Sequence, residues 1–363
     1  MLGYTDTQGN FYVYDNGRNV HLEHQRILSS QPCANSIAYI SSNGTLHYYA
    51  GHAVQDLDIS NPNFYYNTDN YLYYSLGGSF SLYNGKERKY LGYIQNNPYA
   101  FGDSIAGMHD YSEYFFAYYK DRFIELEQHP VQKVIAGDNI LAYIDHLGQM
   151  KIFYQMETTL ADDYIPIAMQ AGANTVAFID NYQYLKVFYA GHIYELYNVP
   201  DIYCLEIPGS TQNVQIDGYC NGPIVYDIQT ELPLFQTGDD LVAYLDESGR
   251  FYVFYKGNVV SLDQQEPEQY TVTDNLLWYI DSNNFLKVFS DGELYTVETY
   301  RPENILADKD IIVYTDLDKR LKAFYKGEHY AISDAIVLDF ALNNALIMYS
   351  SIPNRYQFYS FEK

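Results

Sequence analysis

The sequence has little cysteine: Cys33, Cys204 and Cys220 are its three in 363 residues. They form no CxxC pair and have no metal-ligand spacing, so neither a disulfide framework nor a cysteine zinc site organises the chain. Cys204 and Cys220 could pair within one irregular stretch, but buried free thiols are the favoured interpretation.

Basic residues are also few. Lys and Arg together number 21 against 46 Asp and Glu, which gives a formal charge of −25. Such a surface repels phosphate backbones, so we expect no nucleic-acid partner. No stretch approaches the roughly 18 consecutive apolar residues of a membrane-spanning helix, and we expect a chain that does not span a membrane.

The common catalytic motifs are missing as well. No GxSxG, HExxH, P-loop or GxGxxG is present, which argues against the usual nucleophile, zinc and phosphate sites. We therefore expect no enzyme activity, no catalytic residue, no metal and no cofactor. Recurring acids could indicate calcium or a carboxylate pair for glycoside cleavage, but one Asp at the same turn position in each repeat is what turn geometry requires.

Tyrosine, in contrast, is abundant, with 43 residues, and many of them recur at a fixed interval. The interval is 35 residues or close to a multiple of it, and a period of this kind indicates a repeat architecture. The recurring aromatic residues are Tyr4, Tyr39, Tyr74, Tyr143, Phe178, Tyr244, Tyr279, Tyr314 and Tyr349. Met108 fills the one regular gap in this series. An acid follows two places later at Asp6, Asp110, Asp145, Asp180, Asp246, Asp281 and Asp316.

The clearest repeat unit lies between residues 240 and 263. Its first run ends at Asp246, and Asp with Gly249 three places later is typical of a type I turn. The next run, 251–255, ends at Lys256-Gly257, a pair suited to a two-residue hairpin. If Asp and Gly flank the turn symmetrically, Tyr143 faces Met150 and Ala142 faces Lys151 in the equivalent unit. A further strand precedes each unit, so we expect four antiparallel strands per repeat.

The pattern is strongest at residues 176–196, 241–262, 276–297 and 312–332. It resembles β-propellers, and more narrowly bacterial tandem-repeat proteins built from units such as AYIDNxGxLKVFYKGxxYEL. The resemblance implies an all-β propeller of four-stranded antiparallel blades, about ten or eleven in number. We expect residues 1–363 to form a single array; the alternative is two smaller propellers, 1–200 and 201–363, with an irregular unit at 197–239.

Both ends of the sequence are incomplete repeats. Residues 1–4 already belong to a second strand, and the last repeat supplies a first, second and third strand but no fourth. An array that starts within a unit, with an acidic surface, favours an exported bacterial protein, periplasmic, secreted or on the cell surface; a cytoplasmic protein is the alternative.

The segments that cross between repeats vary in length and chemistry while the strands stay alike, which is how a scaffold varies its binding surface. We expect this loop face to bind a protein partner without catalysis. The alternative is a lectin-like propeller that binds glycans, and a polysaccharide-acting enzyme is a third interpretation. The candidate binding residues on the loop face are Asn96, Asn97, Asp162, Asp163, Tyr164, Tyr300, Arg301 and Glu303.

Overall fold

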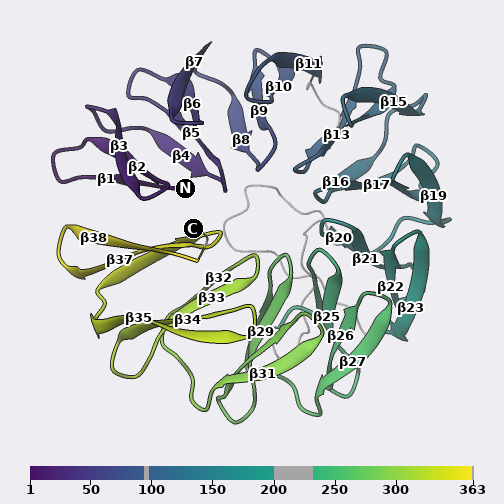
Figure 1. The fold of residues 1–363 in the computed structure, drawn as a ribbon. Coiled ribbons are helices and arrows are strands. Elements are labelled where there is room, and N and C mark those ends of the chain that lie inside the picture. Colours follow the sequence, from purple (N-terminus) through teal and green to yellow (C-terminus); the bar gives the residue numbers. More distant parts are fainter. Residues whose placement is uncertain (94–97, 200–231, 362–363) are drawn as a thin grey trace. The chain divides into compact units, whose positions relative to one another are not determined.

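The computed structural model describes residues 1–93, 98–199 and 232–361, and every regular element in these ranges is a β-strand. Ten antiparallel sheets are formed, eight of four strands and two of three (Figure 1). In each sheet the strands lie side by side in chain order. The prediction of an all-β fold built from four-stranded antiparallel blades, about ten in number, is confirmed. The part of the chain described holds no helix able to span a membrane.

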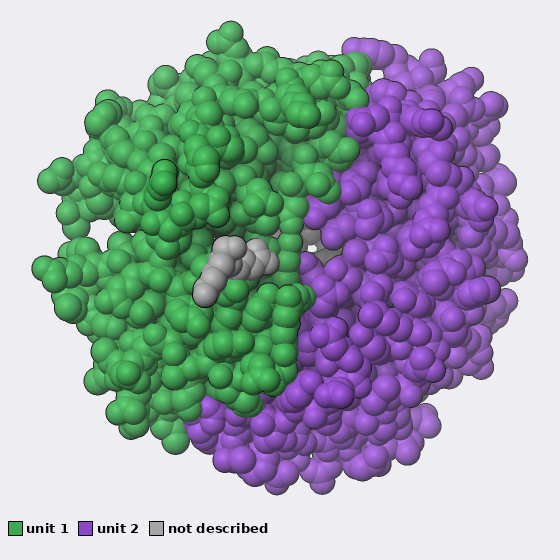
Figure 2. All heavy atoms as spheres, viewed as in Figure 1, with its two compact units in different colours: residues 1–96, 302–363 green, residues 97–301 purple. Residues whose placement is uncertain are grey.

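The chain divides into two compact units (Figure 2). Unit 1 consists of residues 1–96 and 302–363, and unit 2 of residues 97–301. The sheets of unit 1 are β1 (Leu2–Thr5), β2 (Phe11–Asp15) and β3 (Arg18–Glu23); β4 (Ser29–Pro32), β5 (Ser36–Ile40), β6 (Thr45–Ala50) and β7 (Ala53–Ser60); β8 (Phe64–Asn67), β9 (Leu72–Leu76), β10 (Ser79–Tyr83) and β11 (Arg88–Tyr93); β32 (Ile305–Asp308), β33 (Ile311–Thr315), β34 (Arg320–Tyr325) and β35 (Glu328–Ile336); and β36 (Asp339–Asn343), β37 (Leu346–Ile352) and β38 (Arg355–Ser360).

Unit 2 contributes five sheets of four strands each. They are β12 (Ala100–Phe101), β13 (Ile105–His109), β14 (Phe115–Tyr119) and β15 (Arg122–Glu127); β16 (Lys133–Ala136), β17 (Ile140–Ile144), β18 (Met150–Tyr154) and β19 (Glu157–Asp162); β20 (Ala168–Ala171), β21 (Thr175–Ile179), β22 (Tyr184–Tyr189) and β23 (His192–Asn198); β24 (Phe235–Thr237), β25 (Leu241–Leu245), β26 (Phe251–Tyr255) and β27 (Asn258–Asp263); and β28 (Gln269–Val272), β29 (Leu276–Ile280), β30 (Leu286–Ser290) and β31 (Glu293–Glu298). Most of the expected irregular unit at 197–239, with Cys204 and Cys220, lies outside the described residues.

We number the turns of a sheet by their order in the chain, so that the first turn joins the first and second strands. The second turn is the one that carries the recurring acid, and the third is the hairpin. A crossing joins the fourth strand to the next sheet.

The two three-stranded sheets are the first and last in the chain. By its repeat position β1 is a second strand, and among the described residues it pairs only with β2. The last sheet contains a first, second and third strand, β36 to β38. Both incomplete repeats are therefore as predicted.

The register across the second turn differs from the predicted one. Ile144 lies opposite Met150, and Tyr143 lies opposite Lys151. The prediction that Tyr143 faces Met150 is thus wrong by one residue. The same shifted pairs recur as Phe178 with Lys186, Tyr279 with Lys287 and Tyr314 with Lys322.

The shift arises because the second turn holds one residue more than a symmetric type I turn. Asp145 N donates to Gln149 O at 2.9 Å, so three residues lie between the last paired positions. Gly148, the last of the three, adopts φ of 85°. A type I turn followed by a left-handed residue is the common three-residue hairpin, and glycine accepts that conformation without a Cβ clash.

The third turn follows the prediction. Tyr255 pairs with Asn258, which leaves Lys256 and Gly257 as a two-residue loop with φ of 48° and 86°. Positive φ at both positions defines the type I′ turn that matches the twist of the flanking strands.

The cores lie between neighbouring sheets. One of them joins Phe115 of β14 with Val134 of β16, Tyr143 of β17 and Phe153 of β18. A sheet with apolar side chains on both faces needs a neighbour on each side, which is the physical basis of a repeat fold.

Candidate functional site

The recurring acids serve the second turns. Asp145 Oδ1 accepts hydrogen bonds from Leu147 N and Gln149 N, both at 2.9 Å, and the Asp145 side chain is 1% exposed. Asp180 accepts the equivalent bonds from Tyr182 N and Tyr184 N. A carboxylate that closes its own turn in this way has a structural role, as the turn chemistry indicated.

A lysine of the third strand links each of several turns to the neighbouring sheet. Lys151 Nζ lies 2.9 Å from Asp145 Oδ2 and 2.7 Å from Glu127 Oε1 at the end of β15. Burial lowers the pKa of Lys151, but the bonds to Glu127 and Asp145 outweigh it and leave that pKa raised. Burial likewise raises the pKa of Asp145, but Lys151 and the turn N–H groups outweigh it and leave that pKa lowered.

Three of the candidate residues lie at the end of β19 and in the crossing that follows it. Asp162 accepts a hydrogen bond from Tyr164 N at 3.0 Å and lies 3.6 Å from Lys186 Nζ, so it belongs to the ion pairs between sheets. Asp163 and Tyr164 are exposed, and Asp163 Oδ1 accepts a hydrogen bond from Gln149 Nε2 at 3.3 Å.

The other candidate residues lie elsewhere. Tyr300 is half-buried and Arg301 is exposed in the segment after β31, where Arg301 Nη2 donates to Gln269 Oε1 at 3.3 Å. Three sheets along the chain, β20–β23, β24–β27 and β28–β31, separate this segment from Tyr164. Glu303 is exposed in unit 1, and Asn96 and Asn97 lie outside the described residues.

Tyr164 is part of a cluster that the sequence prediction did not include. Its ring lies 6.3 Å from that of Tyr182, at an interplanar angle of 87°. Tyr182 lies in the second turn between β21 and β22, and Leu147 in the second turn between β17 and β18. Leu147 is 71% exposed, Tyr182 65% and Tyr164 51%. We call these three residues the loop patch.

Polar side chains border the loop patch. Beside Leu147, the ring of His146 lies 4.3 Å from that of His129, and Gln132 Nε2 donates to His146 O. Gln149, two residues after Leu147, donates to Asp163, which directly precedes Tyr164. An exposed apolar surface with a polar border is the usual composition of an interaction site.

The loop patch can be recognised in the sequence from the residue types at one turn position. At the turn position of Leu147 and Tyr182, six of the other second turns carry polar residues: Gln8, Asn43, Ser112, Ser248, Asn283 and Asp318. A large apolar side chain is not needed to build this turn, so its presence in two neighbouring repeats indicates another use.

In the described ranges no group of three His, Cys, Asp or Glu side chains is placed to hold a metal ion. The acids near the loop patch bond to turn N–H groups, lysines or amides. What the patch offers is a rigid apolar surface with hydrogen-bonding neighbours.

The 10-bladed beta propeller domain family matches residues 1–97, 91–206 and 219–361, and the chain belongs to this family. No curated protein matches the sequence.

Solved structures show distant likenesses. The computationally designed Ika8 protein shares 16% identity at a TM-score of 0.37, covering 82% of this chain and 96% of that chain. Hsv2 from Kluyvelomyces marxianus shares 11% identity at a TM-score of 0.32, covering 90% and 93%. BamB from Moraxella catarrhalis shares 12% identity at a TM-score of 0.29, covering 92% and 96%. Likenesses at this level say nothing about what this chain binds.

Proposed function

We propose that this protein is a non-catalytic scaffold that binds a protein partner through the loop patch. The observation that carries the proposal is the cluster of exposed side chains Leu147, Tyr164 and Tyr182. Leu147 and Tyr182 project from turns that the buried acids Asp145 and Asp180 hold in place. Anchoring side chains on a rigid frame lose little conformational freedom on binding, and tyrosine is enriched among the residues that supply most of the energy of protein interfaces.

The charge of the chain constrains the partner. At a formal charge of −25, an acidic partner would be repelled, and a basic one would be attracted over a distance of about a Debye length. We therefore expect a partner with an apolar contact surface and a basic border that faces Asp163.

The test is a binding measurement with patch and control variants. A partner is first recovered from an extract of the native cell and purified, and its dissociation constant is then measured by calorimetry. Leu147→Ser and Tyr182→Ser should each weaken binding by roughly tenfold or more, as expected for interface anchors. Leu317→Ser is the matched control, because Leu317 is an exposed leucine on a second turn of unit 1.

Retention of full affinity by the Leu147→Ser/Tyr182→Ser double variant would overturn the assignment of the loop patch. An equal loss in the Leu317→Ser control would point to a general effect of removing surface leucines. Turnover of a small substrate by the purified chain would overturn the non-catalytic role.

Glycan binding is the second candidate, favoured by one feature. The exposed Tyr164 and Tyr182 rings stand beside the Gln149–Asp163 pair, and flat rings next to amide and carboxylate groups suit sugar rings. A glycan array distinguishes the two candidates: a ligand whose binding is lost in Tyr164→Ser would favour the lectin-like function, and a blank array with folded protein would remove it.

A further inference from the structure

Two histidines from different segments of unit 2 are in contact beside the loop patch. His129 lies in the crossing between β15 and β16, and His146 lies in the second turn between β17 and β18. The centroids of their rings are 4.3 Å apart, at an interplanar angle of 45°, and both residues are exposed. His146 directly precedes Leu147, and Gln132 Nε2 donates to His146 O at 3.3 Å. The histidine pair therefore adjoins the loop patch through the backbone of one turn.

The same contact is made by neutral side chains in two other repeats. In the sheet β4–β7, Ser42 Oγ donates to Gln25 Oε1 at 2.6 Å. In the sheet β28–β31, Ser282 Oγ donates to Gln265 Oε1 at 2.6 Å. Each serine directly follows the turn-acid position, and each glutamine precedes its serine by the same number of residues as in the histidine pair. A glutamine and a serine are thus sufficient to build this junction, and two histidines are not required for it.

The elements beside the histidine pair carry groups that are charged between pH 5 and 8. These groups are Asp110, Glu113, Glu125, Glu127, Lys133, Asp145, Lys151 and Asp163. Glu127 and Asp145 both pair with Lys151. Among the described residues neither His129 nor His146 takes part in an ion pair. A proton on either ring is therefore not neutralised by a bound carboxylate.

Protonation of this pair would change the charge beside the loop patch. Histidine is the side chain that takes up a proton between pH 5 and 8. The Cα atoms of consecutive residues such as His146 and Leu147 are about 3.8 Å apart. This separation is well below the Debye length of about 8 Å at physiological ionic strength, so a charge on His146 acts on whatever is seated on Leu147.

We propose that the His129–His146 pair makes the loop patch release its partner at mildly acidic pH. This regulation rests on the proposed function. When the rings are neutral, a partner covers them without removing water from a charge. When they are cationic, covering them costs desolvation, and they repel the basic border that we expect the partner to have.

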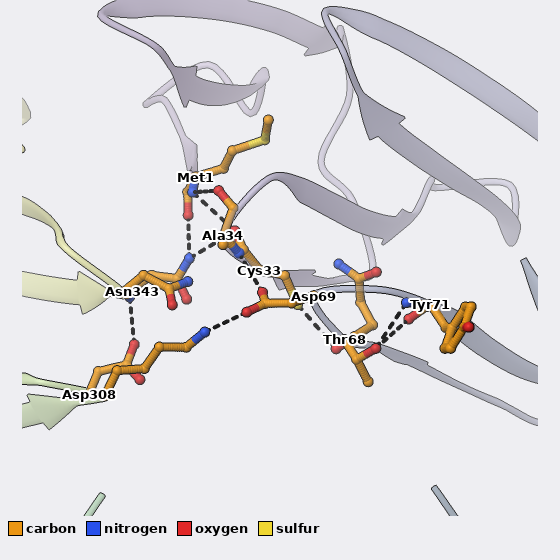
Figure 3. Close-up of polar contacts among 11 residues, drawn as sticks. Met1, Cys33, Ala34, Thr68, Asp69, Tyr71, Asp308 and Asn343 are labelled. Carbon is orange, nitrogen blue, oxygen red and sulfur yellow. Dashed lines mark hydrogen bonds and ion pairs between the residues drawn. The ribbon is translucent and has the colours of Figure 1, made fainter. Parts of the chain in front are cut away.

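Other groups that titrate in this pH range are separate from the pair. The Met1 ammonium group belongs to unit 1, where it donates to Cys33 O at 3.1 Å and to Ala34 O at 3.0 Å (Figure 3). In unit 2, burial lowers the pKa of His109 to about 4 and raises the pKa of Asp239 to about 7. The test must therefore change the histidine pair and leave these groups in place.

The test replaces the histidine pair with the pair that the chain uses elsewhere. His129→Gln/His146→Ser introduces the side chains of Gln265 and Ser282, which carry no charge at any pH in this range. Calorimetry with the purified partner at pH 7.5 and pH 5.5, in the presence of a metal chelator, gives two dissociation constants for each chain. Binding should weaken in acid by roughly tenfold or more for the unaltered chain, and by no more than about twofold for the variant.

A measurement without the partner tests the contact between the rings. NMR spectroscopy follows the protonation of each imidazole from pH 5 to pH 8. Two rings in contact should titrate in separate steps, because the first proton opposes the second. In the single variant His146→Ser, the His129 ring should take up its proton in one step and at a higher pH. An unchanged titration of His129 in this variant would overturn the proposal.

Two results with the partner would also overturn it. One is an equal change of affinity with pH in the unaltered chain and in His129→Gln/His146→Ser. The other is tighter binding in acid, which would identify an acidic partner. Undiminished binding by Leu147→Ser/Tyr182→Ser at pH 7.5 would remove the loop patch and this regulation together. Binding that needs Leu147 and Tyr182 but does not change with pH would overturn the regulation alone, so the two failures can be told apart.

Discussion

Lys151 of β18 and Glu127 of β15 form an ion pair between neighbouring sheets, with Lys151 Nζ 2.7 Å from Glu127 Oε1. Tyr143 OH donates to the same carboxylate oxygen at 3.1 Å. Similar links recur: Lys287 bridges Asp281 and Asp263, and Lys186 bridges Asp180 and Asp162. The recurring turn acid therefore has two tasks, since one oxygen closes the turn and the other holds the lysine that connects two sheets.

Removing Lys151 should lower the stability of the folded protein. Lys151→Met leaves two largely buried carboxylates, those of Asp145 and Glu127, without their cation, and breaking a buried ion pair typically costs about 3–5 kcal/mol. Because Lys151 is partly exposed, we expect a loss of roughly 2 kcal/mol, measured as a lower thermal midpoint in calorimetry.

The control for that experiment is Arg250→Met. Arg250 Nε pairs with the turn acid Asp246 at 2.9 Å, but this arginine is nearly half exposed. An exposed pair contributes about 0–1 kcal/mol, so the midpoint should move little. Equal shifts in the two variants would contradict the importance of the link between sheets.

Low pH should weaken the contacts between the turn acids and their lysines. Burial raises the pKa of Asp281, but Lys287 and the N–H groups of the turn outweigh it and leave that pKa below its ordinary value, as for Asp145. A carboxyl group with a lowered pKa binds fewer protons in the folded state, so its stabilisation is complete above about pH 4 and is lost as the pH falls further.

Thermal unfolding between pH 2.5 and 6 measures this effect, and the midpoint should fall below about pH 4. Asp281→Asn should flatten that fall, because the variant has one titrating turn acid fewer. An unchanged slope would show that Asp281 does not contribute.

A substitution in the third turn between β22 and β23 should stabilise the protein. Ala190 adopts φ of 49° before Gly191, in a region that residues with a Cβ occupy at a cost of about 1 kcal/mol. Asparagine tolerates this conformation, and Asn-Gly is the preferred type I′ pair. Ala190→Asn should therefore stabilise the protein by about 0.5–1 kcal/mol, seen as a higher thermal midpoint.

Asn16-Gly17 provides the reverse experiment, because this turn already carries the preferred pair, with φ of 46° and 82°. Asn16→Ala should destabilise the protein by a similar amount. A rise in the midpoint of Asn16→Ala, or a fall in that of Ala190→Asn, would contradict the conformational argument.

Much of the fold follows from the repeat, since the recurring tyrosine, turn acid and hairpin glycine locate the second, third and fourth strands. The predicted register was wrong by one residue. The left-handed residue Gly148 adds one residue to the second turn, and the spacing of Asp and Gly alone does not show this. The spacing also could not show that the lysine next to Tyr143 reaches an acid of the preceding sheet, because that contact depends on how two sheets pack.

The candidate binding residues were chosen from variable crossings, and this choice included Tyr164 but omitted Leu147 and Tyr182. The latter two lie on turns that share the same backbone hydrogen bond in eight of the ten described sheets. Their exposure follows from the turn, whereas the contact of Tyr182 with Tyr164 depends on packing between two sheets, which a single sequence does not reveal.

Asp239 at the first turn between β24 and β25 should make unit 2 less stable as the pH rises. The turn is crowded, because Asp239 N donates to Asp274 O at 2.6 Å and Asp239 Oδ1 accepts a bond from Ala173 N at 3.0 Å. Burial, followed by the carboxylates of Asp274 and Asp138, raises the pKa of Asp239 to about 7, although the Ala173 N–H lowers it.

A carboxyl group with a raised pKa binds more protons in the folded state than in the unfolded state. Its contribution to stability is therefore full below about pH 4, the ordinary value, and is lost as the pH rises to about 7. Asp239→Asn keeps an oxygen for the Ala173 N–H but carries no charge. It should raise the thermal midpoint at pH 8 by roughly 2–4 °C, the shift that about 1 kcal/mol produces in a domain of 150–250 residues, and change it little at pH 4.

Asp240→Asn is the matched control at the next position. Asp240 is partly exposed and lies 3.9 Å from Lys256 Nζ, so removal of its charge should leave the midpoint at pH 8 unchanged or slightly lower. Calorimetry of the two variants from pH 4 to pH 8 separates the outcomes. An Asp239→Asn variant that keeps the pH slope of the unaltered protein would show that Asp239 is already ionised in the folded chain at pH 4, and that the carboxylates of Asp274 and Asp138 do not act on it as their positions require.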